Sequence, residues 1–259
     1  MRLALDAGWL ARLHAAAQAP PRIARVPLWA GQAMVGSVEP DFLPRLKLPA
    51  SLVREHSTGW QLQGDVTSTL DVLARAMREA GVAHVWRDEQ LAVTDDRGRT
   101  LGTVERAAVR PLGITTFAVH LAGGAPDGRH WVQQRSMSKA NDPGLWDTLM
   151  GGLVPACDSL EEALARETWE EAGLRMRQLH DLRYGGRITT RRPSRDVPAG
   201  FIVEHIDWYR CVVPQRVLPA NQDGEVQQFA LLDTGELARK LLGDEFTLEA
   251  ALVLSQSAL

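Results

Sequence analysis

The chain has 259 residues, of which 45% are hydrophobic and 24% charged, and its formal net charge is −3 at pH 7. This composition is ordinary for a globular protein, and the length allows one large domain or two modest ones with a real core. No basic block stands out from the acidic background, which argues against nucleic-acid binding, and two cysteines are too few for a disulfide framework or a zinc cluster.

A helical pattern opens the chain over residues 1–19, with Leu3, Leu10, Leu13 and a run of alanines. It lacks the basic start and the continuous apolar core of a signal peptide. No stretch reaches about 18 uninterrupted apolar residues, the length needed to cross a membrane. Because two thiols also suit a reducing compartment, we expect a soluble, cytoplasmic protein with no membrane partner.

The residues that follow carry short, mixed elements. Loose alternation over residues 26–38 predicts a hairpin. Thr67 or Ser68 is the expected N-cap of a helix that stops at Gly81. Its apolar face repeats at helical spacing and comprises Leu70, Leu73, Ala76, Met77 and Ala80.

Short strands are predicted at residues 83–86 and 90–94. Residues 1–110 therefore form a small α+β unit in which no catalytic cluster is evident. Its role is either structural, as a cap or an oligomer surface, or one of substrate selection.

The pattern changes at Thr115. Alternating hydrophobic residues up to Leu121, a glycine pair, and a second run at residues 130–135 predict two antiparallel strands. Arg135 at the end of the second strand can reach a substrate phosphate, or it can be an ordinary surface charge.

A short helix with clear ends is predicted between Ser159 and Gly173. Ser159 is a good N-cap, and Glu162 three residues later completes a capping box. Gly173 stands where helices favour a left-handed residue. The side chains expected to face a core are Leu160, Ala163, Leu164 and Thr168.

The other face of this helix carries three carboxylates. Glu167, Glu170 and Glu171 stand at i, i+3 and i+4, so they project from adjacent turns on one side. Like charges this close are unfavourable unless a cation lies among them, and Mg²⁺ or Mn²⁺ prefers carboxylate oxygens. Arg166 can neutralise and orient one carboxylate. The alternative is a solvated acidic face.

This stretch resembles the signature of the Nudix hydrolases, G-x5-E-x7-R-E-U-x-E-E-x-G-U, where U is aliphatic. The matching positions are Gly152, Arg166, Glu167, Glu170, Glu171, Gly173 and Leu174. Two positions depart from it: Thr168 replaces an aliphatic residue, and Asp158 replaces the first glutamate. In the family that glutamate mainly braces the signature arginine, so the shorter Asp158 puts the brace in question.

The resemblance implies further roles. With Glu167, Glu170 and Glu171, the carbonyl of Gly152 would hold Mg²⁺ or Mn²⁺. The loop before the glycine pair carries an aromatic residue, Trp146, which can stack on a substrate ring or belong to the core. An additional acidic residue, predicted at Glu225, would act as metal ligand or base. Glu167 or Glu225 would accept the proton of the attacking water.

A basic patch follows the helix in a segment that contains Pro and Gly and is read as a loop. It comprises Arg187, Arg191, Arg192 and Arg195. Arginine binds phosphate oxygens in pairs, so a diphosphate clamp by Arg187 and Arg191 is expected, with a solvated loop as the alternative. Beyond it we predict a long strand over residues 201–213, a strand after Glu225, and two C-terminal helices, the second capped by Thr247.

The likeness extends to several flanking segments. These are Arg87-Asp88-Glu89, Val104-Glu105-Arg106-Ala107-Ala108, Lys139-Ala140, Trp146-Asp147, Asn221-Gln222-Asp223-Gly224-Glu225 and Glu245-Phe246-Thr247-Leu248. They are similar to a two-domain Nudix subgroup related to proteins labelled thiamine-pyrophosphokinase-like. That subgroup implies hydrolysis of the diphosphates of thiamine and its oxidised forms, giving a monophosphate and phosphate.

The sequence thus predicts an α/β fold: a small α+β domain at residues 1–110, then a Nudix α/β/α sandwich with a mixed sheet at residues 111–259. We expect a metal-dependent hydrolase of a small-molecule diphosphate, and a homodimer by family habit. Two alternatives stay open. One is a pyrophosphatase of ADP-ribose, dinucleotides or nucleotide sugars, and the other is a non-catalytic ligand-binding module.

Overall fold

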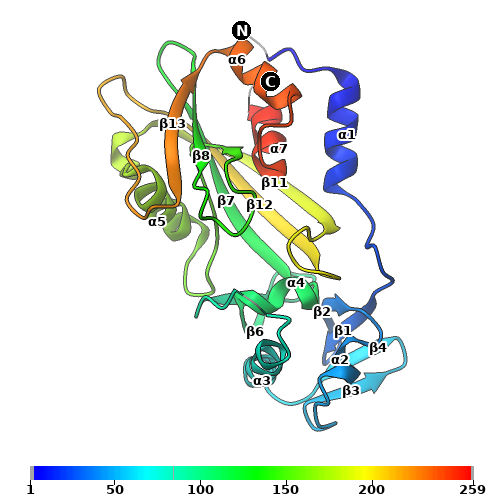
Figure 1. Ribbon diagram of the computed structural model, residues 1–259. Coiled ribbons are helices and arrows are strands. Elements are labelled where there is room, and N and C mark those ends of the chain that lie inside the picture. Colours follow the sequence, from blue (N-terminus) through cyan, green and yellow to red (C-terminus); the bar gives the residue numbers. More distant parts are fainter. Residues whose placement is uncertain (1–2, 84, 258–259) are drawn as a thin grey trace.

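A mixed sheet forms the centre of the larger, C-terminal body of the computed structural model, which describes residues 3–83 and 85–257 (Figure 1). The strand order is β11-β12-β7-β8-β13, with β10 beside β7 and β9 beside β8. Their bounds are β7 Thr115–Gly124, β8 His130–Arg135, β9 Trp146–Asp147, β10 Met150–Leu153, β11 His180–Pro193, β12 Phe201–Val212 and β13 Val226–Leu232. Only β7 and β12 pair in parallel within this set.

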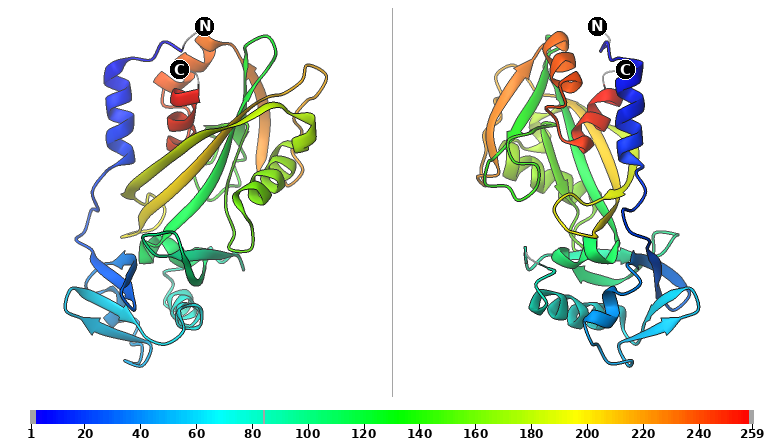
Figure 2. Two further views of the ribbon diagram at one scale, coloured as in Figure 1. Left: turned by 180° about the vertical axis from the view of Figure 1, so that it is seen from behind. Right: turned by 45° about the vertical axis from the view of Figure 1, so that its right-hand side comes forward.

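Helices cover both faces of this sheet (Figure 2). Helix α5 (Leu160–Ala172) lies on one face, and α1 (Ala7–Ala17), α6 (Thr234–Leu242) and α7 (Leu248–Ser257) lie on the other. Strand β7 divides its side chains between them, because successive residues of a strand point to opposite faces. Val119 and Leu121 join the core beneath α5, and Ala118 and Ala122 join the core beneath α7. The predicted α/β/α sandwich is confirmed.

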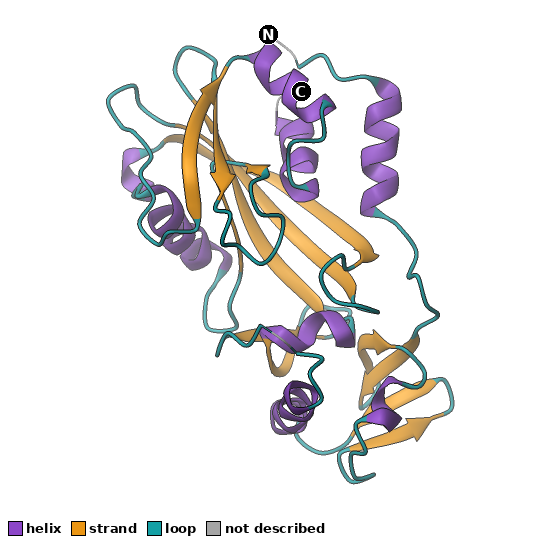
Figure 3. Cartoon of the chain, in the orientation of Figure 1, coloured by secondary structure: helices purple, strands orange, loops and turns teal. Residues whose placement is uncertain are grey.

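The smaller N-terminal unit mixes helices and strands around its own core (Figure 3). Its elements are β1 Val26–Ala30, β2 Ala33–Val38, α2 Phe42–Arg45, β3 Val53–His56, β4 Gly59–Leu62, α3 Val66–Glu79, β5 Gln90–Thr94, β6 Thr100–Glu105, a 3₁₀ turn Arg106–Ala108 and α4 Val109–Leu112. The first four strands form a sheet in the order β2-β1-β4-β3, and β5 pairs with β6. The predicted hairpin at residues 26–38 is therefore confirmed.

The packing of the two bodies departs from the predicted domain boundary between residues 110 and 111 in two places. The core of the N-terminal unit runs from Leu28 to Ile114. Helix α1 packs instead on the C-terminal body, where Trp9 and Leu13 are buried against α7. Its Trp9 Nε1 also donates a hydrogen bond to Asp244 Oδ1 at 3.0 Å. The domain boundaries remain a prediction, with α1 joined by contact to the second body.

Several local predictions need correction. Helix α3 begins two or three residues earlier than expected, because Asp65 is its N-cap and accepts a hydrogen bond from the backbone of Ser68 at 2.9 Å. Of the strand predicted at residues 83–86, His84 lies outside the described residues, and the other three residues are not in a strand. The glycine pair at 123–124 belongs to β7, and the chain reverses after it.

The arginine-rich segment is not a loop, because most of it forms the long strand β11, paired with β12. Ser194 and the following residues, which include Arg195, form the connection to β12. Among the described residues no helix is long and apolar enough to cross a membrane.

Candidate active site

Helix α5 has the ends that its sequence predicts. The Ser159 side chain accepts a hydrogen bond from the backbone of Glu162, and the Glu162 side chain accepts one from the backbone of Ser159. Gly173 ends the helix at a φ of +64°, a conformation that costs glycine little. The predicted capping box and glycine stop are confirmed, and they fix where the helix begins and ends.

Arg166 forms hydrogen bonds with three carboxylates around the acidic face of α5. Its Nε donates to Asp158 Oδ2 at 2.9 Å, and its Nη1 donates to Glu167 Oε1 at 3.0 Å and to Glu170 Oε2 at 2.9 Å. Asp158 therefore braces the arginine although it is one methylene shorter than the signature glutamate. The guanidinium brings two of the three predicted metal ligands together and offsets their repulsion.

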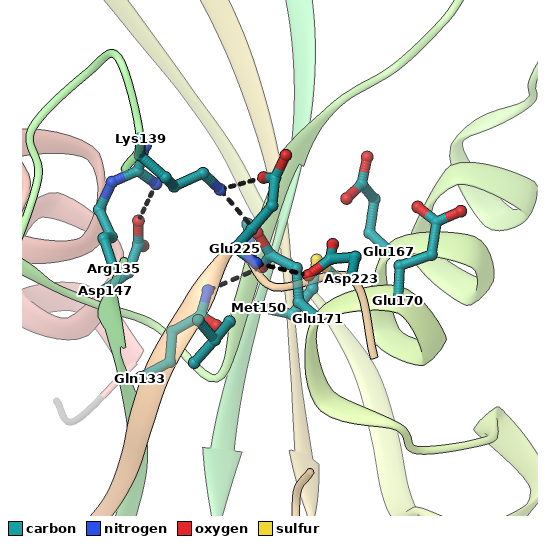
Figure 4. Close-up of polar contacts among 12 residues, drawn as sticks. Gln133, Arg135, Lys139, Asp147, Met150, Glu167, Glu170, Glu171, Asp223 and Glu225 are labelled. Atoms are coloured by element: carbon teal, nitrogen blue, oxygen red, sulfur yellow. Dashed lines mark hydrogen bonds and ion pairs between the residues drawn. The ribbon is translucent and has the colours of Figure 1, made fainter. Parts of the chain in front are cut away.

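Glu171 lies on the side of α5 that faces the sheet, and residues of the sheet hold it (Figure 4). Its side chain is buried, and its Oε2 accepts hydrogen bonds from Gln133 Nε2 at 2.7 Å and from the backbone of Gly151 at 3.0 Å. Lys139 Nζ lies 3.2 Å from Glu171 Oε1 and also pairs with the carboxylate of Glu225. One lysine thus joins the buried end of α5 to the predicted additional acid.

Burial and crowding raise the pKa values of the inner carboxylates. Burial first, and then the charge of Glu171, raise the pKa of Glu167 to about 7. Burial also raises the pKa of Glu171, against the opposing effect of Lys139. For Glu225 the pKa is lowered: burial raises it, and the contact with Lys139 more than offsets this. A cation placed among these groups would relieve the strain that burial creates.

These side chains line a cavity of about 500 Å³, which we call the carboxylate chamber. The predicted residues that line it are Gly152, Arg166, Glu167, Glu170, Glu171, Glu225 and Arg135. Arg135 donates to Asp147 Oδ2 at 3.2 Å and to the backbone oxygen of Asn141 at 3.0 Å, which fixes its guanidinium at the wall. The chamber matches the volume of a small-molecule site.

Three predicted substrate-binding residues lie elsewhere. Arg187 pairs with Asp207 at 2.8 Å outside the chamber, and Arg191 is exposed. Both point away from the chamber because side chains alternate between the two faces of strand β11. Residues 187 and 191 lie on one face of the strand, whereas Arg192 lies on the other face and lines the chamber. Trp146 is buried in the core beneath α7, with Lys240 Nζ 4.9 Å from its ring centre.

A model of the Nudix domain matches residues 115–250, more than half of the chain. The chain belongs to the Nudix family. It is 29% identical to the protein YJR142W of Saccharomyces cerevisiae over 204 residues, which are 71% of this chain and 59% of that protein. It is 32% identical to the chloroplastic Nudix hydrolase 24 of Arabidopsis thaliana over 140 residues, 52% of this chain and 37% of that protein. The matches thus span less than two thirds of either relative.

Among solved structures, DR0079 from Deinococcus radiodurans superposes with a TM-score of 0.52 at 22% identity. The match covers 65% of this chain and 99% of the other. At this identity the match establishes similarity of fold, and it agrees with the α/β/α architecture described above.

Several cations of this Nudix chamber went unrecognised in the sequence as site residues. They are Arg87, Arg106, Arg110, Lys139 and Arg192. The first three precede the matched Nudix region and belong to the N-terminal unit. Arg192 belongs to the predicted basic patch but was not selected for the clamp, and the other four were missed because they stand outside that patch and outside the signature. The flanking segments that contain Arg87, Arg106 and Lys139 were the available signal.

The chamber fits a divalent cation by its chemistry. The absence of a side chain at Gly152 makes room for the carboxylate of Glu167, since a Cβ atom there would lie 2.2 Å from Glu167 Cδ. The carboxylate oxygens are hard donors of the kind that Mg²⁺ and Mn²⁺ prefer. Among residues 3–83 and 85–257, no three acidic, histidine or cysteine side chains already converge on one point. Arg166 contacts one oxygen each of Glu167 and Glu170, and Lys139 contacts one oxygen of Glu171, so these two cations hold the carboxylates in place.

Proposed function

We propose that this Nudix protein is a metal-dependent hydrolase that cleaves a diphosphate linkage in a small molecule. One observation carries the proposal: the carboxylates of α5 line a single chamber together with cations from the N-terminal unit, from β8 and the loop after it, and from β11. Phosphoryl transfer depends on positioning and on charge stabilisation, and this arrangement supplies both.

Each side chain has a role in that reaction. The Gly152 carbonyl with Glu167, Glu170 and Glu171 would hold Mg²⁺ or Mn²⁺. When bound, such an ion polarises the diphosphate and lowers the pKa of a bound water. Glu167 or Glu225 accepts the proton of the water that attacks phosphorus.

Other cations of the chamber bind the phosphate oxygens in this proposal. Arg135 and Lys139 already line the chamber, and guanidinium groups match phosphate geometry in pairs. Arg187, Arg191 and Trp146 have no such role in this proposal, because each lies outside the chamber.

The substrate proposed first is a diphosphate of thiamine or of its oxidised analogues, hydrolysed to a monophosphate and phosphate. It rests on the resemblance of the flanking segments to the thiamine-pyrophosphokinase-like Nudix subgroup. ADP-ribose, dinucleotides and nucleotide sugars are the competing class, and a non-catalytic binding module is the competing function. A cytoplasmic location and a homodimer are proposed with it.

Phosphate release with Mg²⁺ across a panel of diphosphates tests the proposal. The panel holds thiamine diphosphate, oxothiamine and oxythiamine diphosphates, ADP-ribose, a dinucleotide and a nucleoside triphosphate. Preference for the thiamine compounds supports the subgroup, and preference for ADP-ribose keeps the mechanism and discards that substrate. No turnover across the panel, with Mn²⁺ still bound, favours the binding module.

The variant Glu171→Gln separates catalysis from fold. We expect its turnover to fall by about 10²- to 10³-fold, as when one charge-stabilising group is lost, and its affinity for Mn²⁺ to fall in parallel. Glu161→Gln is the matched control, because Glu161 lies on the same helix in an exposed position. Near-normal turnover of Glu171→Gln with Mg²⁺ would contradict the proposed metal site.

A further inference from the structure

A second cavity of about 250 Å³ adjoins the carboxylate chamber where the two bodies of the protein meet. We call it the junction pocket. The two cavities are neighbours, because both are lined by Arg106, Arg110, Leu153 and Glu204, among others. The N-terminal unit supplies one wall, and strand β12 with the loop before it supplies another.

Most of the lining of the junction pocket is apolar. Its aliphatic and aromatic side chains are Val82, Val85, Val109, Ile114, Leu153, Val197, Phe201, Ile202 and Val203. Pockets for organic groups have this composition, with a few polar groups that fix orientation. The carboxylate chamber, in contrast, is lined largely by charged residues. A ligand that spans both cavities therefore has a charged end and a compact, mainly apolar end.

Glu204 is the polar group at the boundary between the cavities. It lies on β12 directly opposite Thr116 of β7, whose Oγ1 donates to Glu204 Oε2 at 2.9 Å. Within the described residues, neither a hydrogen-bond donor to Glu204 Oε1 nor a cation at ion-pair distance is found. The nearby cations have other partners: Arg110 pairs with Asp196 at 2.8 Å, and Arg192 pairs with Glu249 at 2.6 Å.

Glu204 is half-buried, so its carboxylate is incompletely hydrated and, without a paired cation, costs some free energy. Burial and the neighbouring charge of Glu249 raise the pKa of Glu204, while Thr116, Arg110 and His120 oppose the shift. A ligand that donates a hydrogen bond to Oε1 would recover part of this cost.

We propose that the junction pocket binds the organic group of the diphosphate substrate, and that Glu204 recognises an N–H donor on a compact heterocycle there. The inference rests on the proposed function for the position of the diphosphate in the chamber. Glu204 then determines specificity, whereas the carboxylates of α5 carry the reaction. The N-terminal unit takes part in substrate selection, because residues 82–114 supply much of the wall.

Binding of heterocycles without their phosphates tests this inference independently of hydrolysis. Calorimetry would use thiamine, oxythiamine and adenosine, each of which carries an N–H donor, with the full chain in the absence of metal. We expect at least one to bind, and Glu204→Leu to weaken its binding by about 10- to 100-fold, as for a lost hydrogen bond to a charged group. Glu204→Gln keeps a carbonyl acceptor and should be intermediate.

A second pair of variants tests the pocket itself. Val197→Trp places a large side chain in the cavity from a loop and should abolish binding of the heterocycle. Pro198→Trp is the control, because Pro198 is the exposed neighbour and does not line the pocket. The melting temperature of Glu204→Leu should not fall below that of the wild type, which separates lost recognition from unfolding.

Each outcome has one meaning. With the best diphosphate of the panel, the KM of Glu204→Leu should rise by the same factor as its Kd for the heterocycle, while kcat changes little. Absence of binding by the wild type, or an unchanged Kd in Glu204→Leu, overturns the inference even if hydrolysis is found. If heterocycle binding depends on Glu204 but the wild type hydrolyses no diphosphate, the inference about the junction pocket is supported and the proposed hydrolase function is contradicted.

Discussion

The carboxylate chamber and the junction pocket share lining residues, but they differ in whether their carboxylates are paired with cations. In the chamber, Arg166 and Lys139 compensate the acidic face of α5, and Lys139 comes from a different segment. In the junction pocket, Glu204 has a hydroxyl partner and, among the described residues, no cation at ion-pair distance. The two cavities therefore differ in how their carboxylates are compensated, and the proposed roles of an ion and a diphosphate in the chamber and of an organic group in the pocket follow from that difference.

The largest expected effect is on stability, in Lys139→Met. Removing one partner of a buried ion pair leaves Glu171 without a cation, so the free energy of unfolding should fall by about 3 kcal/mol. Urea unfolding measures it, and added Mg²⁺ should restore part of the loss. Lys240→Met is the control, because the Lys240–Glu245 pair is more exposed and should cost under about 1 kcal/mol. Equal losses would show that the chamber is not compensated as described.

Next in size is an effect on turnover, in Gly152→Ala. The new Cβ atom would lie 2.2 Å from Glu167 Cδ and displace that carboxylate, so kcat should fall by about 100-fold. Gly124→Ala on β7 is the control, since the nearest atom to its Cβ is the Cys211 backbone oxygen at 3.5 Å, an ordinary contact. The measurement is kcat in steady-state kinetics with the best substrate. Equal kcat values in the two variants would show that Glu167 has no role in the reaction.

Glu204→Leu should have the opposite sign to Lys139→Met. Replacing an uncompensated carboxylate by an apolar group should raise the free energy of unfolding by about 1 to 2 kcal/mol at pH 7. Since burial raises the pKa of Glu204 in the folded state, the wild type binds more protons folded than unfolded between the two pKa values and loses stability as pH rises. The gain of the variant should therefore shrink between pH 7 and pH 5, and a pH-independent gain would contradict this account.

The smallest effect concerns the helix that orients the chamber. Ser159→Ala removes the acceptor for the backbone of Glu162 and should lower the free energy of unfolding by about 1 kcal/mol. Ser51→Ala, at an exposed turn position, should change it by less than about 0.5 kcal/mol. If chemical unfolding shows no difference between them, the capping box does not secure α5.

Two arginine-bearing segments show where sequence reasoning succeeded and failed. In α5, Arg166 and its glutamates were assigned correctly to one face, because residues three and four apart on a helix are neighbours. In β11, Pro and Gly suggested a loop, and pairing with β12 overrode that local preference. The strand then separated Arg192 from Arg187 and Arg191, so the residue facing the chamber was not one of the two selected as a clamp.

The sequence by itself determined the ends of α5, its acidic face and the Nudix signature, because these depend on residues a few positions apart. The α/β/α order of elements was implied by the resemblance to the Nudix family. Only the tertiary structure decided which charges meet. Lys139 reaches Glu171 across 32 positions, and Glu204 meets residues of the N-terminal unit at the junction pocket. Such contacts form only when the sheet and both bodies are assembled, so no short spacing in the chain encodes them.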